Sequence, residues 1–302
     1  MFTRMLVALD GSKLAENVLP YVRTFAGALK LPVELLSVVE SLDFARTSHA
    51  GHARALDSII EGVRRDSQQY LDKVAQSFSG VAVTCLVEQG EADKTIIERA
   101  AGDKETLIAM ATRGRSGIHR WLIGSVAEKV LRGATNPILL VRGDEERKTD
   151  GAATLKSIVV PLDGSKLAEI VLPRAIELAK RLRLEIVLTR AYQLPLSTYT
   201  AADAPYIPDS DALRTAPREE AEAYLEAKVS ELEENGIEKV SSTLLFGSGA
   251  DEIIDLARTT PDNLIAMCTH GRSGIKRWAL GSVTEKVVRH SGDPVLIVRA
   301  EG

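Results

Sequence analysis

Residues Ala109–Arg142 read AMATRGRSGIHRWLIGSVAEKVLRGATNPILLVR, and Ala266–Arg299 read AMCTHGRSGIKRWALGSVTEKVVRHSGDPVLIVR. An earlier pair also repeats: Leu9–Pro20 read LDGSKLAENVLP, and Leu162–Pro173 read LDGSKLAEIVLP. The chain is therefore a duplication whose copies agree best around glycine-rich segments between apolar runs. Loops on a rigid scaffold carry binding residues disproportionately, so this pattern indicates that the repeated loops hold the function.

The composition is that of a water-soluble globular chain with room for two domains. The 302 residues are 45% apolar and 26% charged, with a net charge of −4. This balance favours neither nucleic acid nor a membrane surface as a partner. No apolar run is long enough for a signal peptide or a membrane span, so we expect a cytoplasmic protein. The two cysteines, Cys85 and Cys268, lie at unmatched positions, which argues against a disulfide framework.

Each copy has the pattern of strands alternating with helices. Continuous apolar runs are typical of strands buried on both faces of a parallel sheet. We expect strands at Arg4–Leu9, Val33–Val39, Val81–Glu88, Thr106–Ala111 and Pro137–Arg142, and again at Ser157–Leu162, Glu185–Ala191, Lys239–Phe246, Asn263–Cys268 and Pro294–Arg299. The order predicts an α/β fold of two tandem, doubly wound, five-stranded parallel-sheet domains. We place these domains at residues 1–145 and 154–302, joined by the polar linker Gly143–Ala153.

Between the strands, the spacing of apolar residues predicts four helices in each copy. The first runs over Ser12–Lys30, and a proline inside it (Pro20, or Pro173 in the second copy) predicts a kink. The others are expected at Leu56–Phe78, around Ile96–Ala100 and from Ser125 onward, with second-copy counterparts at Ala216–Glu234, around Ile253–Ala257 and from Ser282 onward.

The repeated loops are predicted to meet at one place in each domain. In an open parallel sheet, ligands bind beyond the carboxyl ends of the strands, where the strand order reverses. With a 2-1-4 strand order, this point lies between the loops after the first and fourth strands. The residues of these loops are Asp10 with Gly114, Arg115, Ser116 and Gly117 in the first copy, and Asp163 with Gly271, Arg272, Ser273 and Gly274 in the second.

The residue types in these loops suit a phosphate group. The fourth loop ends at Gly124-Ser125 or Gly281-Ser282, where a helix begins, and the free N–H groups of a helix start attract anions. Glycines allow the backbone to approach a ligand closely. Arg115 and Arg272, which are equivalent in the two copies, can neutralise phosphate charge. Arg113 is replaced by His270 in the second copy. Asp10 and Asp163 could hold ribose hydroxyls or a phosphate-bound metal.

A purely structural interpretation of the same residues remains open. Ser125 with Glu128, and Ser282 with Glu285, have the spacing of capping boxes, which stabilise any helix. The glycines could serve a tight turn alone. The five histidines show no metal-ligand spacing, and no nucleophile with its base stands out, so we assign no catalytic residue and no metal ligand.

With these residues in view, nearly the whole chain resembles the universal stress protein family in its tandem form. The family signature is G-x-x-G, nine residues, then G-[ST]; Gly114 with Gly124-Ser125 matches it, as does Gly271 with Gly281-Ser282. The first signature glycine is replaced, by Ala111 in one copy and by Cys268 in the other. The resemblance implies the Rossmann-like fold of adenine nucleotide alpha hydrolases.

The resemblance also implies ATP as the ligand, with or without Mg. It places the adenine against Val38 and Ala191, the ribose near Asp10 and Asp163, and the phosphates at the glycine-rich loops and the following serines. It further implies that the last strands pair the two domains with each other, and a homodimer is possible.

Three functions remain in competition at this point. The first is an ATP-binding stress or signalling protein with one site per domain and little or no hydrolysis, since no general base is evident. The second is an interaction protein whose sites are vestigial, which nucleotide would not stabilise against heat. The third is an adenylyl-transferring enzyme, which the glycine-poor loop after the first strand disfavours and which pyrophosphate release would reveal.

Overall fold

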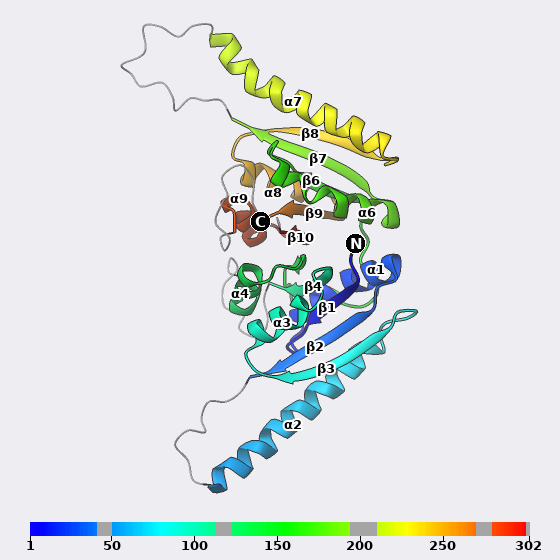
Figure 1. The fold of residues 1–302 in the computed structure, drawn as a ribbon, viewed down its shortest axis with the longest axis vertical. Helices are drawn as coiled ribbons and strands as arrows, with labels where there is room; N and C mark the ends of the chain where they lie inside the picture. The colour runs from blue at the N-terminus through cyan, green and yellow to red at the C-terminus, as the bar shows by residue number, and fades with distance from the viewer. Residues whose placement is uncertain (41–49, 113–122, 194–209, 270–279, 300–302) are drawn as a thin grey trace, which may run out of the picture. The chain divides into compact units, whose positions relative to one another are not determined.

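The computed structural model describes residues 1–40, 50–112, 123–193, 210–269 and 280–299, in two compact units (Figure 1). Unit 1 takes in Met1–Thr154 together with the last strand, β10, and unit 2 takes in most of Leu155–Asp293. The mixed α/β architecture confirms the predicted fold class.

Unit 1 is built on a parallel sheet with the strand order β3-β2-β1-β4-β5. The strands are β1 (Arg4–Ala8), β2 (Val33–Val39), β3 (Val83–Gln89), β4 (Thr106–Ala111) and β5 (Ile138–Val141). The helices are the short 3₁₀ helix η1 (Ala15–Val18), α1 (Leu19–Leu29), α2 (Ala50–Ala75), α3 (Ala92–Ala101) and α4 (Ser125–Gly133). The strand β10 (Val295–Val298) pairs with β5 in the antiparallel direction.

Unit 2 repeats this plan with the strand order β9-β6-β7-β8, again parallel. Its strands are β6 (Ser157–Pro161), β7 (Glu185–Tyr192), β8 (Val240–Phe246) and β9 (Asn263–Cys268). Its helices are α5 (Lys166–Glu169), α6 (Leu172–Leu182), α7 (Ser210–Glu234), α8 (Gly249–Thr259) and α9 (Ser282–His290). In both units the first strand lies between the second and the fourth, so the predicted 2-1-4 order is confirmed.

The central strands are buried, as their apolar sequences require. All six residues of β4 are buried, as are all six of β9. In unit 1 the long helix α2 lies on the outer strands β2 and β3, and in unit 2 the long helix α7 lies on β7 and β8 (Figure 1). Burial of these runs supplies the main stabilisation, at roughly 25 cal/mol for each Å² of apolar surface.

The predicted kinked first helix is wrong in both copies, because the chain forms two helices instead. In unit 1, η1 ends at Val18 and α1 begins at Leu19 with Pro20 in its first turn. In unit 2, α5 ends at Glu169 and α6 begins at Leu172, again with a proline, Pro173, in the first turn. Proline has no N–H to give to the preceding turn, so it is accommodated best at a helix start.

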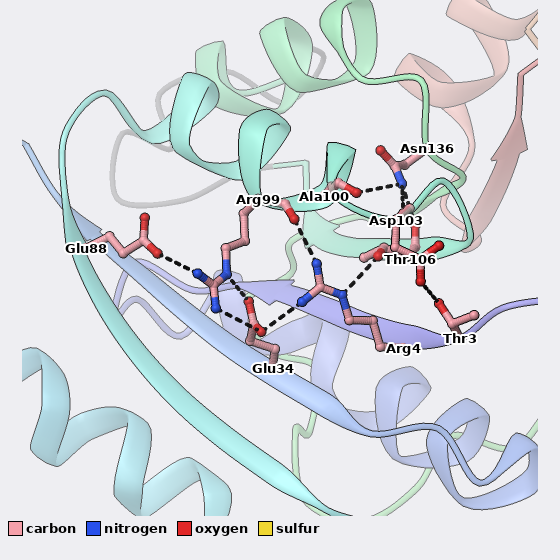
Figure 2. A network of polar contacts seen from close by, with 9 residues as sticks. All are labelled: Thr3, Arg4, Glu34, Glu88, Arg99, Ala100, Asp103, Thr106 and Asn136. Carbon is pink, nitrogen blue, oxygen red and sulfur yellow. Dashed lines mark hydrogen bonds and ion pairs between the residues drawn. The ribbon is translucent and has the colours of Figure 1, made fainter.

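A charged network holds α3 against β1 and β2 in unit 1 (Figure 2). The Glu34 carboxylate accepts hydrogen bonds from Arg4 Nη1 at 3.0 Å and Arg99 Nε at 2.6 Å. Arg4 also donates to Thr106 Oγ1 at 3.0 Å and to the Arg99 carbonyl at 2.7 Å, and Arg99 reaches Glu88 at 3.2 Å. The network joins the four strands β1, β2, β3 and β4 to one helix, so it fixes where α3 lies on the sheet.

The polar linker is bound to unit 1 over part of its length. Arg23 on α1 donates to the carbonyls of Thr149, at 2.7 Å, and Gly151, at 2.8 Å. Thr24 donates to the Ala153 carbonyl at 2.7 Å. These contacts attach the linker to the first domain.

Both cysteines are free thiols, and Cys85 is predicted to be unreactive. Burial, the charge of Asp72 and a hydrogen bond to that carboxylate raise the pKa of Cys85 to about 11. At pH 8 only about 0.1% of this thiol is then ionised, and the thiolate is the reactive form. We expect Asp72→Asn to accelerate iodoacetamide labelling of Cys85 at pH 8 severalfold, as measured by peptide mass spectrometry. Equal labelling rates in the two proteins would show that Asp72 does not control this thiol.

Candidate functional site

A cavity of about 560 Å³ opens at the carboxyl edge of the unit 1 sheet. It lies where the ends of β1, β2 and β4 meet the start of α4, which is the place that the strand order predicts for a ligand. Five predicted site residues line it: Asp10, Val38, Ala111, Gly124 and Ser125. Residues far apart in the sequence therefore converge on one space of a size typical of small-molecule sites.

Asp10 is held in position by the turn that follows β1. Its Oδ1 accepts the Ser12 amide at 2.9 Å, and Gly11 between them has φ of 79°, a left-handed conformation that glycine adopts without strain. Ser12 Oγ in turn accepts the Ala15 amide at 3.1 Å, which starts the next helix. The carboxylate is thus fixed at the cavity wall by local backbone contacts.

The start of α4 presents backbone amides without a cap. The N-cap residue is Gly124, which has no side chain to accept a hydrogen bond, and its own amide donates to the Thr112 carbonyl. The first α4 amide bonded within the described backbone is that of Glu128, to the Gly124 carbonyl at 2.9 Å. The preceding amides, of residues 125–127, have no acceptor among the described residues, so the helix start can receive an anion.

The predicted capping boxes are wrong for the same reason. A capping box needs serine at the N-cap, but Ser125 and Ser282 are the first helical residues, and Gly124 and Gly281 are the N-caps. Neither N-cap has a side-chain hydrogen bond to the helix. The serines therefore do not cap these helices, and capping does not explain why the two copies share these positions.

One wall of the cavity comes from α2, which sequence reasoning missed. Ile59, Ile60 and Val63 line the cavity, and Ile59 and Val63 are 55% and 43% exposed. Large apolar side chains left open to solvent are a recognised mark of a binding surface. Ile59, Ile60 and Val63 are visible in the sequence as apolar residues of a helix rich in charged residues, but their contact with the strand ends is a tertiary feature. The missed lining residues from other elements include Ser37, Ala92, Ile96 and Thr112.

Unit 2 repeats the turn and the helix start. Asp163 Oδ1 accepts the Ser165 amide at 2.9 Å and its hydroxyl at 2.6 Å, and Gly164 has φ of 84°. Gly281 is the N-cap of α9, its amide donates to the Thr269 carbonyl at 2.9 Å, and Ser282 follows it. Cys268 ends β9 and is buried, and Ala191 lies near the end of β7.

The remaining predicted residues lie outside the described part of the chain. They are Arg113, Gly114, Arg115, Ser116, Gly117, His270, Gly271, Arg272, Ser273 and Gly274. Within the described ranges, no group of three or more histidine, cysteine, aspartate or glutamate side chains is arranged to hold a metal ion. Among the helices that the structure describes, none combines the length and the apolar character that crossing a membrane requires.

Comparison with known families decides the family. The universal stress protein family matches the chain twice, over residues 1–142 and 154–299. The chain belongs to the universal stress protein family. The two matches coincide with the two copies in the sequence, so this is a universal stress protein of tandem form.

The known relatives include proteins that match nearly the whole chain and proteins that match about half of it. A universal stress protein from Mycolicibacterium smegmatis is 22% identical over 299 residues, which is 98% of this chain and 96% of that protein. One from Methanocaldococcus jannaschii is 31% identical over 150 residues, covering 50% of this chain and 85% of that protein. The crystal structure of a universal stress protein from Archaeoglobus fulgidus has a TM-score of 0.68, with 21% identity and 98% of each chain covered, which shows a shared fold.

Proposed function

We propose that the unit 1 cavity binds an adenine nucleotide, with ATP as the expected ligand, and that the chain acts as a cytoplasmic stress-response or signalling protein. The observation that carries this proposal is the junction, in one cavity, of an apolar compartment and a helix start with uncapped amides. A nucleotide has the same two halves, an aromatic base and an anionic tail, so the cavity and the ligand are complementary.

The lining residues suggest one orientation for the nucleotide. The base fits the apolar side, between Val38 at the end of β2 and the α2 residues Ile59 and Val63. Asp10, at the end of β1, is placed to accept hydrogen bonds from ribose hydroxyls. The phosphates fit at Gly124-Ser125, where the α4 amides and the helix dipole favour negative charge.

We expect little or no hydrolysis at this site. The carboxylates among the described lining residues are Asp10 and Glu40. Asp10 already holds the turn through its Oδ1, which suits a positioning role better than proton transfer from an attacking water. Mg would be bound by the phosphates and oriented by Asp10. Nucleotide state, rather than turnover, would then be the signal.

The proposal predicts that nucleotide stabilises the protein. A ligand present at 100 times its dissociation constant adds about 2.7 kcal/mol to the free energy of unfolding. We expect millimolar Mg-ATP to raise the melting temperature by several degrees, with ADP giving a smaller rise. GTP, whose base carries different polar groups, is the matched comparison for base recognition. A second comparison is cAMP, because a universal stress protein of half this length, 22% identical to this chain, has been solved in complex with it.

Direct calorimetric titration and a phosphate-release assay complete the test. No heat and no thermal shift with any of the four nucleotides at millimolar concentration would reject nucleotide binding and favour the vestigial-site function. Steady release of phosphate at several turnovers per second would reject the non-hydrolysing role. Release of pyrophosphate with transfer to an acceptor would instead identify an adenylyl transferase.

A further inference from the structure

The part of the unit 1 cavity that is proposed to hold the nucleotide base differs from the corresponding part of unit 2. On β2, Ser37 is a cavity-lining residue with 6% of its surface exposed. Met5 pairs with Val33 in unit 1, and Ile158 pairs with Ile186 in unit 2, so strand register places Arg190 of β7 where β2 has Ser37. The short side chain of Ser37 in unit 1 therefore corresponds to the long, positively charged side chain of Arg190 in unit 2.

Arg190 is packed against α7 by two interactions. Its Nη2 lies 2.6 Å from Glu220 Oε1, and its Cζ lies 4.9 Å from the centre of the Tyr224 ring. Only 7% of the arginine side chain is exposed. An arginine this buried needs both a charge partner and a ring face, because removing either leaves a poorly solvated cation.

Tyr224 is fixed in turn by residues next to the first loop of unit 2. Its hydroxyl donates to Glu169 Oε1 at 2.7 Å, and Lys228 Nζ reaches Glu169 Oε2 at 2.9 Å. Burial and the hydrogen bond to Glu169 raise the pKa of Tyr224, and the charge of Asp163 adds to the rise. The tyrosine therefore lies within electrostatic reach of the counterpart of Asp10.

The same space in unit 1 is open. In the sequence, Tyr70-Leu71 of α2 corresponds to Tyr224-Leu225 of α7, so both copies have this tyrosine. The same alignment pairs Ser67, which lines the unit 1 cavity, with Ala221, one helical turn before Tyr224. Around that position, α2 and Ser37 border a cavity, whereas α7 and Arg190 are joined by an ion pair and a cation–π contact. The two copies thus share the turn and the helix start that suit phosphates, and differ where the base would lie.

We propose that each chain binds one nucleotide, in unit 1, because Arg190, which stands in unit 2 where unit 1 has Ser37, occupies the space that the nucleotide base needs and is held there by Glu220 and the Tyr224 ring. This inference rests on the proposed function and adds its stoichiometry. A base entering unit 2 would have to separate Arg190 from Glu220 and from the Tyr224 ring while the cation stays buried. Unit 1 imposes no such cost, since Ser37 leaves its cavity free.

The test is a binding stoichiometry on the full chain with radiolabelled ATP in equilibrium dialysis. Ser37→Arg brings the unit 2 residue into unit 1 and is expected to lower the affinity at least tenfold. Val63→Arg places an arginine at the same cavity from α2 and is also expected to lower the affinity at least tenfold. Because Val63 is 43% exposed, an arginine can be accommodated there without unfolding. Ala82→Arg is the matched control, because it adds the same charge at an exposed position next to the start of β3, at the opposite edge of the sheet. Circular dichroism and melting curves verify that each variant is folded.

We expect one ATP per chain for the wild type and for Ala82→Arg, and loss of that binding in both cavity variants. Two ATP per chain in the wild type would overturn this inference and leave the proposed function intact. One ATP per chain that persists at wild-type affinity in folded Ser37→Arg and Val63→Arg would also overturn it, because the occupied site would not be unit 1. No binding at millimolar ATP would instead reject the proposed function, and this inference with it.

Discussion

Ala111→Leu is expected to weaken nucleotide binding on the order of 10- to 100-fold. Ala111 ends β4, is 8% exposed and lines the unit 1 cavity beside Gly124-Ser125. A leucine there extends into the cavity and overlaps the ligand, and overpacking of this kind costs about 1–3 kcal/mol. The added side chain enters empty space in the ligand-free protein, so the free protein should keep its melting temperature. Calorimetric titration with Mg-ATP measures the change in dissociation constant.

Ala111→Gly is the matched control for this prediction. It restores the glycine of the family signature at that position and removes a methyl group from the cavity wall. We expect affinity equal to or higher than that of the wild type. An affinity for ATP in Ala111→Leu that equals the wild-type value would show that the ligand does not occupy this end of the cavity.

Glu34→Ala is expected to lower the free energy of unfolding by about 2–3 kcal/mol. The Glu34 side chain is 11% exposed and is the shared partner of Arg4 and Arg99. Removing it leaves two partly buried guanidinium groups without their common charge partner, which costs more than the ion pair itself contributes. The full cost of a buried pair is reduced here because Arg4 and Arg99 are 26% and 36% exposed. Urea denaturation followed by circular dichroism measures the difference.

Glu91→Ala supplies the comparison for an exposed ion pair. Glu91 lies 2.5 Å from Lys94, and both side chains are 62% exposed. Solvent screens such a pair, so we expect no measurable change in the free energy of unfolding. A Glu34→Ala protein as stable as Glu91→Ala would mean that the network around Glu34 does not hold α3 in place.

Much of the fold followed from the sequence, because buried parallel strands must be continuously apolar. The predicted bounds of β4 and β9 agree with the structure, and all ten predicted strands occur in the expected order. Helix ends were less accurate: α2 runs over Ala50–Ala75 rather than Leu56–Phe78, since polar residues do not mark where a solvated helix stops. The proline positions were noticed, yet each begins a new helix instead of bending one.

The candidate site was predictable where it depends on the repeat and unpredictable where it depends on packing. The turns at Asp10 and Asp163 and the helix starts at Gly124 and Gly281 recur as sequence, and both copies fold them alike. The α2 residues that line the cavity are not part of a repeated sequence motif. The apolar residues of α2 meet β2 only because the helix crosses the strand ends in the folded protein.

The sequence by itself determined the duplication, the family, the alternation of strands and helices, and the turn and helix start that line the unit 1 cavity. Those properties are local or periodic, so a one-dimensional pattern can carry them. Only the tertiary structure decided that Gly124 leaves the α4 amides uncapped, and that Ser37 borders a cavity while Arg190 is paired with Glu220 and Tyr224. Whether such a space is open or filled depends on side chains from separate elements that only folding brings together.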